Sequence, residues 1–177
     1  MFRQLRTEGI VLRKRNLLGK DILLTFFSSE YGKIHAIAKG IKKITSRRAS
    51  HVQTGNLVFI ECYRKSDRLY LQHSRLISAF SQIKKSSKKM SLLYRCLFII
   101  DRLLPELQPE LNLYEDLKRF LITISQSEKI NEHDLLEGFL TKLLRHLGYG
   151  EQKKTLIEQI MYIQELIGEK IPESDII

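Results

Sequence analysis

The sequence is poor in the residues that build disulfide frameworks and metal sites. Its 177 residues include two cysteines, Cys62 and Cys96, and no CxxC pair. Both cysteines lie in apolar segments, where a thiol is normally buried and reduced. The pattern excludes a secreted disulfide scaffold and a zinc ribbon. We expect no metal and no cofactor.

Long apolar runs and a leader segment are also missing. The longest apolar runs, such as residues 97–100, are far shorter than the roughly 20 residues that a membrane-spanning helix needs. The first nine residues, MFRQLRTEG, lack the apolar region of a signal peptide. We therefore expect a soluble cytoplasmic protein with no membrane contact.

The common signatures of catalysis are absent as well. The sequence contains no GxxxxGK[ST], GxGxxG, HExxH or GxSxG motif. Its histidines, at positions 35, 51, 73, 133 and 146, do not have the spacing of metal ligands. We predict no catalytic residue and expect that the protein is not an enzyme.

Positive charge is abundant, and it is confined to one half of the chain. Residues 1–89 hold 20 Lys and Arg against 5 Asp and Glu, whereas residues 90–177 hold 10 against 15. The halves therefore carry net charges of +15 and −5, within a formal total of +10. This separation indicates a module that faces a polyanion, and nucleic acid is the first candidate.

The basic half has the pattern of a small β-barrel. Short apolar or alternating segments at residues 9–15, 21–28, 33–38, 57–63 and 69–77 predict five strands. A longer basic connection, residues 39–56, separates the third strand from the fourth. This is the element order of an OB-fold, and an SH3-like barrel is the alternative.

The second half changes to a helical period after Ala79. Apolar residues at helical spacing predict helices within residues 82–104, 111–125, 132–147 and 151–167. We predict a β + α chain of two domains. Residues 1–79 would form a five-stranded OB-fold that binds nucleic acid, and residues 80–177 an all-α helical bundle that binds partners.

The candidate nucleic-acid contacts are the basic residues of loops and strand ends, because these converge on one rim of a small barrel. They are Arg13, Lys14, Arg15, Lys39, Lys42, Lys43, Arg47, Arg48, Arg64, Lys65 and Arg68. Basic loop residues also occur simply as solvated surface. Binding through phosphates would be strongly salt-dependent and weakly sequence-specific.

Aromatic and further basic residues extend this prediction. Tyr31, Tyr63 and Tyr70 are candidates for base stacking, although each also suits a core or edge position of the barrel. Lys84, Lys85, Lys88 and Lys89 would share one helix face if the first helix begins early. They would then extend the nucleic-acid track, or else form a solvated junction.

Several segments together resemble a known family. GIVL at 9–12, Gly19 to Asp21, LLTFF at 23–27, YGK at 31–33 and AKG at 38–40 are similar to the N-terminus of the RecO family of bacterial recombination mediators. IIDRLLP at 99–105 and LLRHLGY at 143–149 resemble later helices of the same family. The resemblance covers residues 1–150.

The resemblance implies an OB-fold, a helical domain and a role in recombinational repair at the nucleoid. Family members bind single- and double-stranded DNA, anneal complementary strands and act with RecR. They also engage the C-terminal tail of the single-stranded DNA-binding protein SSB, and help to load RecA. Many carry a four-cysteine zinc motif after the LGY helix, whereas this chain has no cysteine after Cys96. We expect a short form without zinc.

Two other functions remain open from the residues alone. The barrel could be an adaptor that recognises acidic protein tails, or it could be an OB-fold protein that binds RNA.

Overall fold

The computed structural model describes residues 4–41, 48–128, 131–149 and 155–172. It divides the chain into two compact units. The barrel unit comprises Met1–Ala79 together with Leu104–Pro109, and the helical unit comprises Phe80–Leu103 and Glu110–Ile177. A short segment between two helices therefore belongs to the barrel unit, although 24 residues of helical unit separate it from the rest of the barrel.

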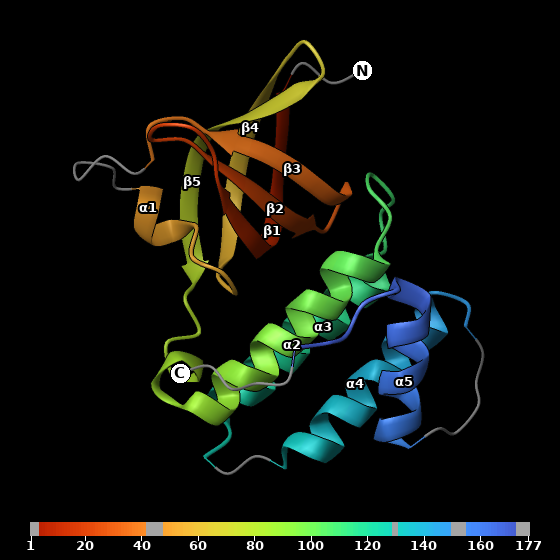
Figure 1. The fold of residues 1–177 in the computed structure, drawn as a ribbon. Helices are drawn as coiled ribbons and strands as arrows, with labels where there is room; N and C mark the ends of the chain where they lie inside the picture. Colours follow the sequence, from red (N-terminus) through yellow and green to blue (C-terminus); the bar gives the residue numbers. More distant parts are fainter. Residues whose placement is uncertain (1–3, 42–47, 129–130, 150–154, 173–177) are drawn as a thin grey trace. The chain divides into compact units, whose positions relative to one another are not determined.

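Five strands form the barrel unit (Figure 1). They are β1 (Gln4–Asn16), β2 (Ile22–Ser28), β3 (Gly32–Ala38), β4 (Leu57–Lys65) and β5 (Arg68–Ser78). The strands close in the order β1-β2-β3-β5-β4, with β3 parallel to β5 and every other pair antiparallel. This closed five-stranded barrel, followed by helices, confirms the predicted OB-fold and the β + α class.

Alternating side chains produce the barrel core. Ile34, Ala36 and Ala38 point inward from β3, and the residues between them are partly exposed. β2 is different, since Leu24 to Ser28 are all buried. This is the continuous burial that its apolar sequence predicts. The core of the barrel lies between these strands and Val58 and Ile60 of β4.

β1 is longer than its sequence pattern suggests. The predicted strand covers residues 9–15, but β1 begins at Gln4 and pairs along Gln4 to Ile10 with β4. The start of this strand contains Thr7, a polar residue that is buried in the structure and interrupts the apolar pattern of the sequence. An irregularity between Val11 and Arg13 lets the same strand pair with β2 over its second half.

The predicted connection between β3 and β4 contains the short helix α1 (Arg48–His51). Lys42, Lys43 and Arg47 lie outside the described residues. Asn56 holds the end of this connection, because its side-chain amide donates to the carbonyls of Ser50 and His51.

The segment Leu104–Pro109, which we call the strap, docks on the free side of β3. The Leu107 amide donates to the Lys33 carbonyl over 3.0 Å, and Lys33 pairs with Glu106 as a parallel bridge. Gly32, at a φ of 66°, permits a close approach, since a Cβ there would lie 1.9 Å from the Gln108 carbonyl oxygen. Only glycine fits this position without displacing the strap.

The helical unit contains a 3₁₀ turn, η1 (Ile83–Lys85), and four helices (Figure 1). The helices are α2 (Ser87–Leu103), α3 (Leu111–Gln126), α4 (Glu132–His146) and α5 (Leu156–Ile167). Each buries one apolar face, as Leu117, Leu121 and Leu140 illustrate. In the described part of the chain, no helix combines the length and the apolar character needed to cross a membrane.

Helix boundaries follow local capping. Asn131 accepts from the Asp134 amide at the start of α4. Thr155 and Glu158 form a reciprocal capping box at the start of α5, and Gly168 ends that helix in the left-handed conformation. The capping box explains why α5 begins at Leu156 rather than near residue 151.

Candidate nucleic-acid interface

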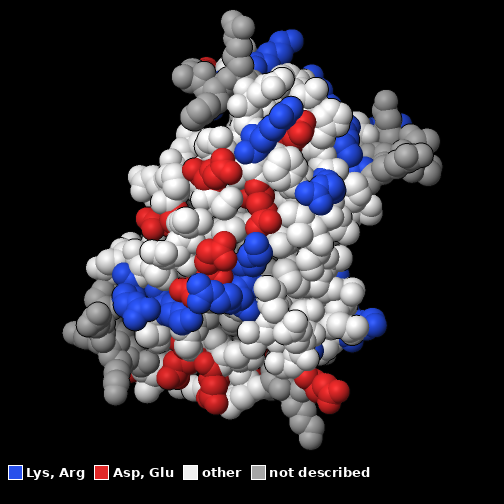
Figure 2. All heavy atoms as spheres, turned by 180° about the vertical axis from the view of Figure 1, so that it is seen from behind, with Lys and Arg blue, Asp and Glu red and all other residues white. Residues whose placement is uncertain are grey.

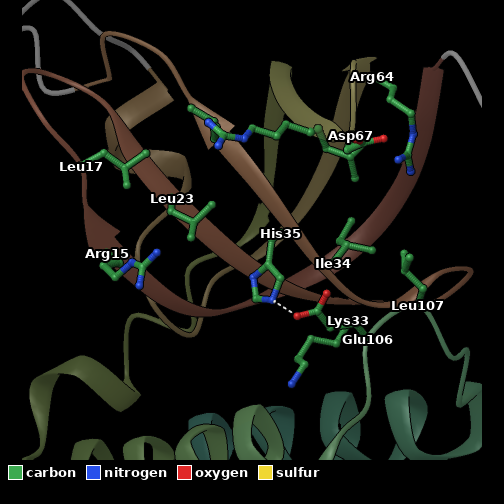
Figure 3. Close-up of a pocket in the computed structure, with 13 residues that line it drawn as sticks. Arg15, Leu17, Leu23, Lys33, Ile34, His35, Arg64, Asp67, Glu106 and Leu107 are labelled. Atoms are coloured by element: carbon green, nitrogen blue, oxygen red, sulfur yellow. Dashed lines mark hydrogen bonds and ion pairs between the residues drawn. The ribbon is translucent and has the colours of Figure 1, made fainter.

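A cavity of about 370 Å³ opens in the surface of the barrel unit (Figure 3). Six of the residues around it are apolar: Leu17, Leu23, Ile34, Ile37, Leu69 and Leu107. The other seven are polar or charged: Arg15, Lys33, His35, Arg64, Asp67, Arg68 and Glu106. We call this site the barrel pocket. Its volume lies within the range of small-ligand sites, and its lining combines apolar contact with positive charge.

The topology of the barrel explains why distant residues meet here. Arg64 and Arg68 flank the β4–β5 turn, which carries Asp67. β5 pairs with β3 at Ala36 and Ile37 only, so the turn lies beside the outer face of β3. Arg15 comes from the end of β1, immediately before the β1–β2 turn. In OB-folds, these two turns and the strands between them are the usual nucleic-acid surface.

His35 stands at the centre of a hydrogen-bonded chain in the pocket. Its Nε2 lies 2.9 Å from Glu106 Oε1 (Figure 3). Its Nδ1 lies 3.0 Å from Thr25 Oγ1. Since an ionised carboxylate only accepts, His35 Nε2 donates to Glu106. In the neutral imidazole, Nδ1 then accepts from the Thr25 hydroxyl. This chain fixes the ring orientation of His35.

Unlike His35, the three arginines of the pocket have no side-chain partner among the described residues. Within the described residues, Arg15, Arg64 and Arg68 make no ion pair or side-chain hydrogen bond. The Nε atom of Arg64 is buried and has no acceptor among those residues. Buried donors are nearly always satisfied in proteins, so Arg64 is suited to meet an acceptor from a ligand. Guanidinium groups also match the geometry of phosphate oxygens.

Predicted residues gather at a second place next to the β4–β5 hairpin. The rings of Tyr63 and Tyr70 stack with centroids 5.3 Å apart and planes 18° apart. Lys39 Nζ lies 4.9 Å from the centroid of Tyr70. Both rings are partly exposed, so this cluster combines a stacked aromatic surface with a cation.

Arg48 has a structural role that its sequence position did not indicate. Its guanidinium donates to the carbonyls of Leu71, Gln72 and Lys39. These bonds tie α1 to β5 and to the end of β3. Arg48 thus supports the position of Lys39, and most of its donors are already in use.

The other predicted barrel residues lie outside the pocket. Lys14 donates to Gln53 Oε1 over 2.5 Å, and burial lowers the pKa of its amine. Arg13 and Lys65 are exposed but do not line the pocket. Tyr31 lies in the β2–β3 turn, at the opposite end of β2 from the β1–β2 turn, and packs against the barrel core. Its core position is the alternative that the sequence left open.

The first helix does not begin early enough to place Lys84, Lys85, Lys88 and Lys89 on one helix face. Lys84 and Lys85 belong to η1, Ser86 is extended, and α2 begins at Ser87. The four lysines therefore do not lie on one helix. Lys89 is buried, and its Nζ donates to the Ser127 carbonyl over 2.5 Å, which leaves it unavailable to a polyanion.

The charge on the face that Figure 2 shows does not by itself mark an interface. On the face that Figure 2 shows, basic and acidic side chains are interspersed and do not form one positive field. The barrel pocket is distinguished instead by the convergence of its arginines with apolar side chains.

Sequence reasoning missed four of the polar or charged residues of the pocket, namely Lys33, His35, Asp67 and Glu106. The alternation of β3 does place Lys33 and His35 on the outer face, which is a signal that could have found them. No local pattern marks Glu106, because it reaches the barrel from between α2 and α3.

Neither cysteine is suited to chemistry at a surface. Burial raises the pKa of the Cys62 thiol to about 12, and it raises that of the fully buried Cys96 as well. Both are free and buried. No group of three or more His, Cys, Asp or Glu that could hold a metal ion occurs in the part of the chain that the structure describes.

The helical unit has its own polar cluster at a smaller cavity, of about 240 Å³. Asp116 accepts from His146 Nε2 over 2.9 Å and from Lys142 Nζ over 3.2 Å. Burial on its own would raise the pKa of Asp116, but the hydrogen bonds and charges of His146 and Lys142 outweigh it and lower that pKa. Phe120 and Phe139 stack beside the cluster.

Comparison with known proteins shows which family the chain resembles. Residues 1–80 match the family described as Recombination protein O N terminal. The chain is also 31% identical over 147 residues to the DNA repair protein RecO of Caldanaerobacter subterraneus subsp. tengcongensis, an alignment that covers 83% of this chain and 59% of that protein. This chain is a RecO homologue.

Other RecO proteins align over a similar extent. The DNA repair protein RecO of Thermoanaerobacter sp. is 31% identical over 85% of this chain and 60% of its own length. That of Syntrophus aciditrophicus is 28% identical over 82% of this chain and 56% of its own length. The chain thus spans somewhat under two thirds of the length of these three proteins, each of which is named as a DNA repair protein.

Proposed function

We propose that the barrel unit binds DNA, and that Arg15, Arg64 and Arg68 contact backbone phosphates in the barrel pocket. The observation that carries this proposal is the convergence of three arginines, all without partners among the described residues, beside an apolar wall. Phosphate contacts to such groups are sequence-independent, whereas the apolar wall can cover sugars and bases.

The Lys39–Tyr63–Tyr70 cluster extends the proposed interface. A partly exposed aromatic pair can stack on an unpaired base, and this contact favours single strands over duplex. Lys39 adds a charge near the same rings. The pocket would then hold the backbone while the tyrosines contact bases.

For the whole protein, we propose the activity of a recombination mediator without enzymatic chemistry. By neutralising phosphates, the barrel would lower the repulsion between complementary strands and allow them to anneal. We assign partner binding to the helical unit, with RecR and the C-terminal tail of SSB as partners and RecA loading as the downstream result. The homology to DNA repair proteins RecO supports this role.

The test compares the parent with Arg64→Ala/Arg68→Ala in a salt titration of single-stranded DNA binding. Loss of two phosphate contacts should reduce the slope of log K against log[salt] by about 1.4. The matched control is Arg6→Ala/Arg75→Ala, which removes the same charge from barrel residues that do not line the pocket. Annealing of SSB-coated strands should slow in the first variant only.

Equal slopes for the two double variants would refute the pocket assignment. An RNA competitor and an acidic peptide distinguish the other barrel functions. If RNA displaces DNA at lower concentration, the protein is an RNA binder. If the peptide binds and naked oligonucleotides do not, it is an adaptor.

A further inference from the structure

The strap adds an acidic side chain to a site that is lined by four basic residues. The bond from the Leu107 amide to Lys33 and the Lys33–Glu106 bridge fix the backbone of the strap on β3. Gly32 approaches Gln108 so closely that a residue with a side chain does not fit at position 32. Glu106 is therefore held at the pocket by main-chain contacts on both of its sides. Its position does not depend on its own side chain.

The Glu106 side chain lines the pocket and is 62% exposed, so it places a negative charge beside the cationic groups that a phosphate would approach. It supplies two anionic oxygens, and one of them already accepts from His35 Nε2. The same pocket is lined by Lys33 and by the three arginines (Figure 3). A carboxylate and a phosphate both seek such donors, and two like charges in one small site repel each other.

We propose that the negative charge of Glu106 competes with nucleic-acid phosphate for the cationic groups of the barrel pocket. This inference rests on the proposed DNA binding. Glu106 lowers the affinity of the pocket for each phosphate, so that a bound strand dissociates or moves along the site more readily. Asp67 also lines the pocket, but it comes from the β4–β5 turn and makes no hydrogen bond to His35.

Glu106→Gln separates the charge from the hydrogen bond. The glutamine carbonyl can still accept from His35 Nε2, whereas the negative charge is gone. We expect this variant to bind single-stranded DNA about three- to five-fold more tightly at low salt, as for one partly exposed ion pair. Its log K against log[salt] slope should steepen by about 0.7, as for one added phosphate contact.

The matched control is Glu30→Gln, which makes the same charge change in the exposed β2–β3 turn of the same unit. It corrects for the general effect of removing one negative charge from the barrel. Protection of the Leu107 amide from hydrogen exchange shows in each variant whether the strap remains docked. Glu106→Ala, which removes both charge and acceptor, should also bind DNA more tightly.

Each outcome bears on the proposal. Tighter binding and a steeper slope in Glu106→Gln but not in Glu30→Gln support it. An unchanged or weaker affinity in Glu106→Gln, or equal gains in both variants, would overturn it. If the parent binds DNA and Arg64→Ala/Arg68→Ala weakens that binding while Glu106→Gln does nothing, the proposed function stands and only this inference fails. If the parent binds no DNA, both fail.

Discussion

Substitution of Gly32 tests whether the strap belongs to the barrel. In Gly32→Ala, an alanine must adopt a φ of 66°, and its Cβ would lie 1.9 Å from the Gln108 carbonyl oxygen. The left-handed conformation alone costs roughly 1–2 kcal/mol for an alanine. The clash also displaces the strap and breaks the bond from the Leu107 amide to Lys33, which contributes about 0.5–1.5 kcal/mol. We expect a total loss of about 1.5–3.5 kcal/mol.

Gly19→Ala is the matched control, because the chain offers a second glycine with almost the same φ and a different neighbourhood. Gly19 has a φ of 68°, and nothing lies within 4 Å of a Cβ built there. This variant carries the conformational cost of roughly 1–2 kcal/mol without the clash. The difference between the two variants therefore isolates the docking of the strap.

Urea unfolding followed by circular dichroism measures the loss of stability, and hydrogen exchange of the Leu107 amide measures the docking. We expect Leu107 to be protected in the parent and in Gly19→Ala, and to exchange quickly in Gly32→Ala. Equal destabilisation of the two variants, with Leu107 equally protected in both, would refute the reasoning.

Two further predictions concern the helical unit. Asp116→Asn should lower the free energy of unfolding by about 1.5 kcal/mol at pH 6, relative to Glu128→Gln as control. Because the folded-state pKa of Asp116 is depressed, its contribution is present above the unfolded pKa near 3.9 and is lost as pH falls through the folded value, so urea unfolding at pH 3 should show a smaller difference. Lys89→Ala should cost about 1–3 kcal/mol in the same assay, since it removes the donor to the half-buried Ser127 carbonyl. Lys88→Ala, at the exposed neighbouring position, should stay within about 0.5 kcal/mol.

Local patterns were enough to predict the barrel strands and the helices, because each element carries its own periodicity. β3 shows this most clearly, since Ile34, Ala36 and Ala38 alternate in the sequence and are buried in the structure. The start of β1 was missed because the buried Thr7 interrupts the apolar pattern, while its backbone still pairs with β4. Pairing with a distant strand overrides the local signal there.

Side-chain roles were harder to predict than elements. Arg48 and Lys89 both looked like free cations in the sequence, yet each donates to backbone carbonyls that lie far away along the chain. In the sequence, a basic residue that stabilises a loop or a helix end looks the same as one that binds phosphate. Only the positions of the acceptors distinguish the two roles.

The strap is the feature that no sequence period marks. Its residues stand between α2 and α3, yet they pair with β3 and carry Glu106 to the barrel pocket. Leu107 adopts a φ of 57°, an uncommon conformation for a residue with a side chain, and the bond from its amide to Lys33 offsets part of that cost. The connection between α2 and α3 thus forms part of the wall of the barrel pocket.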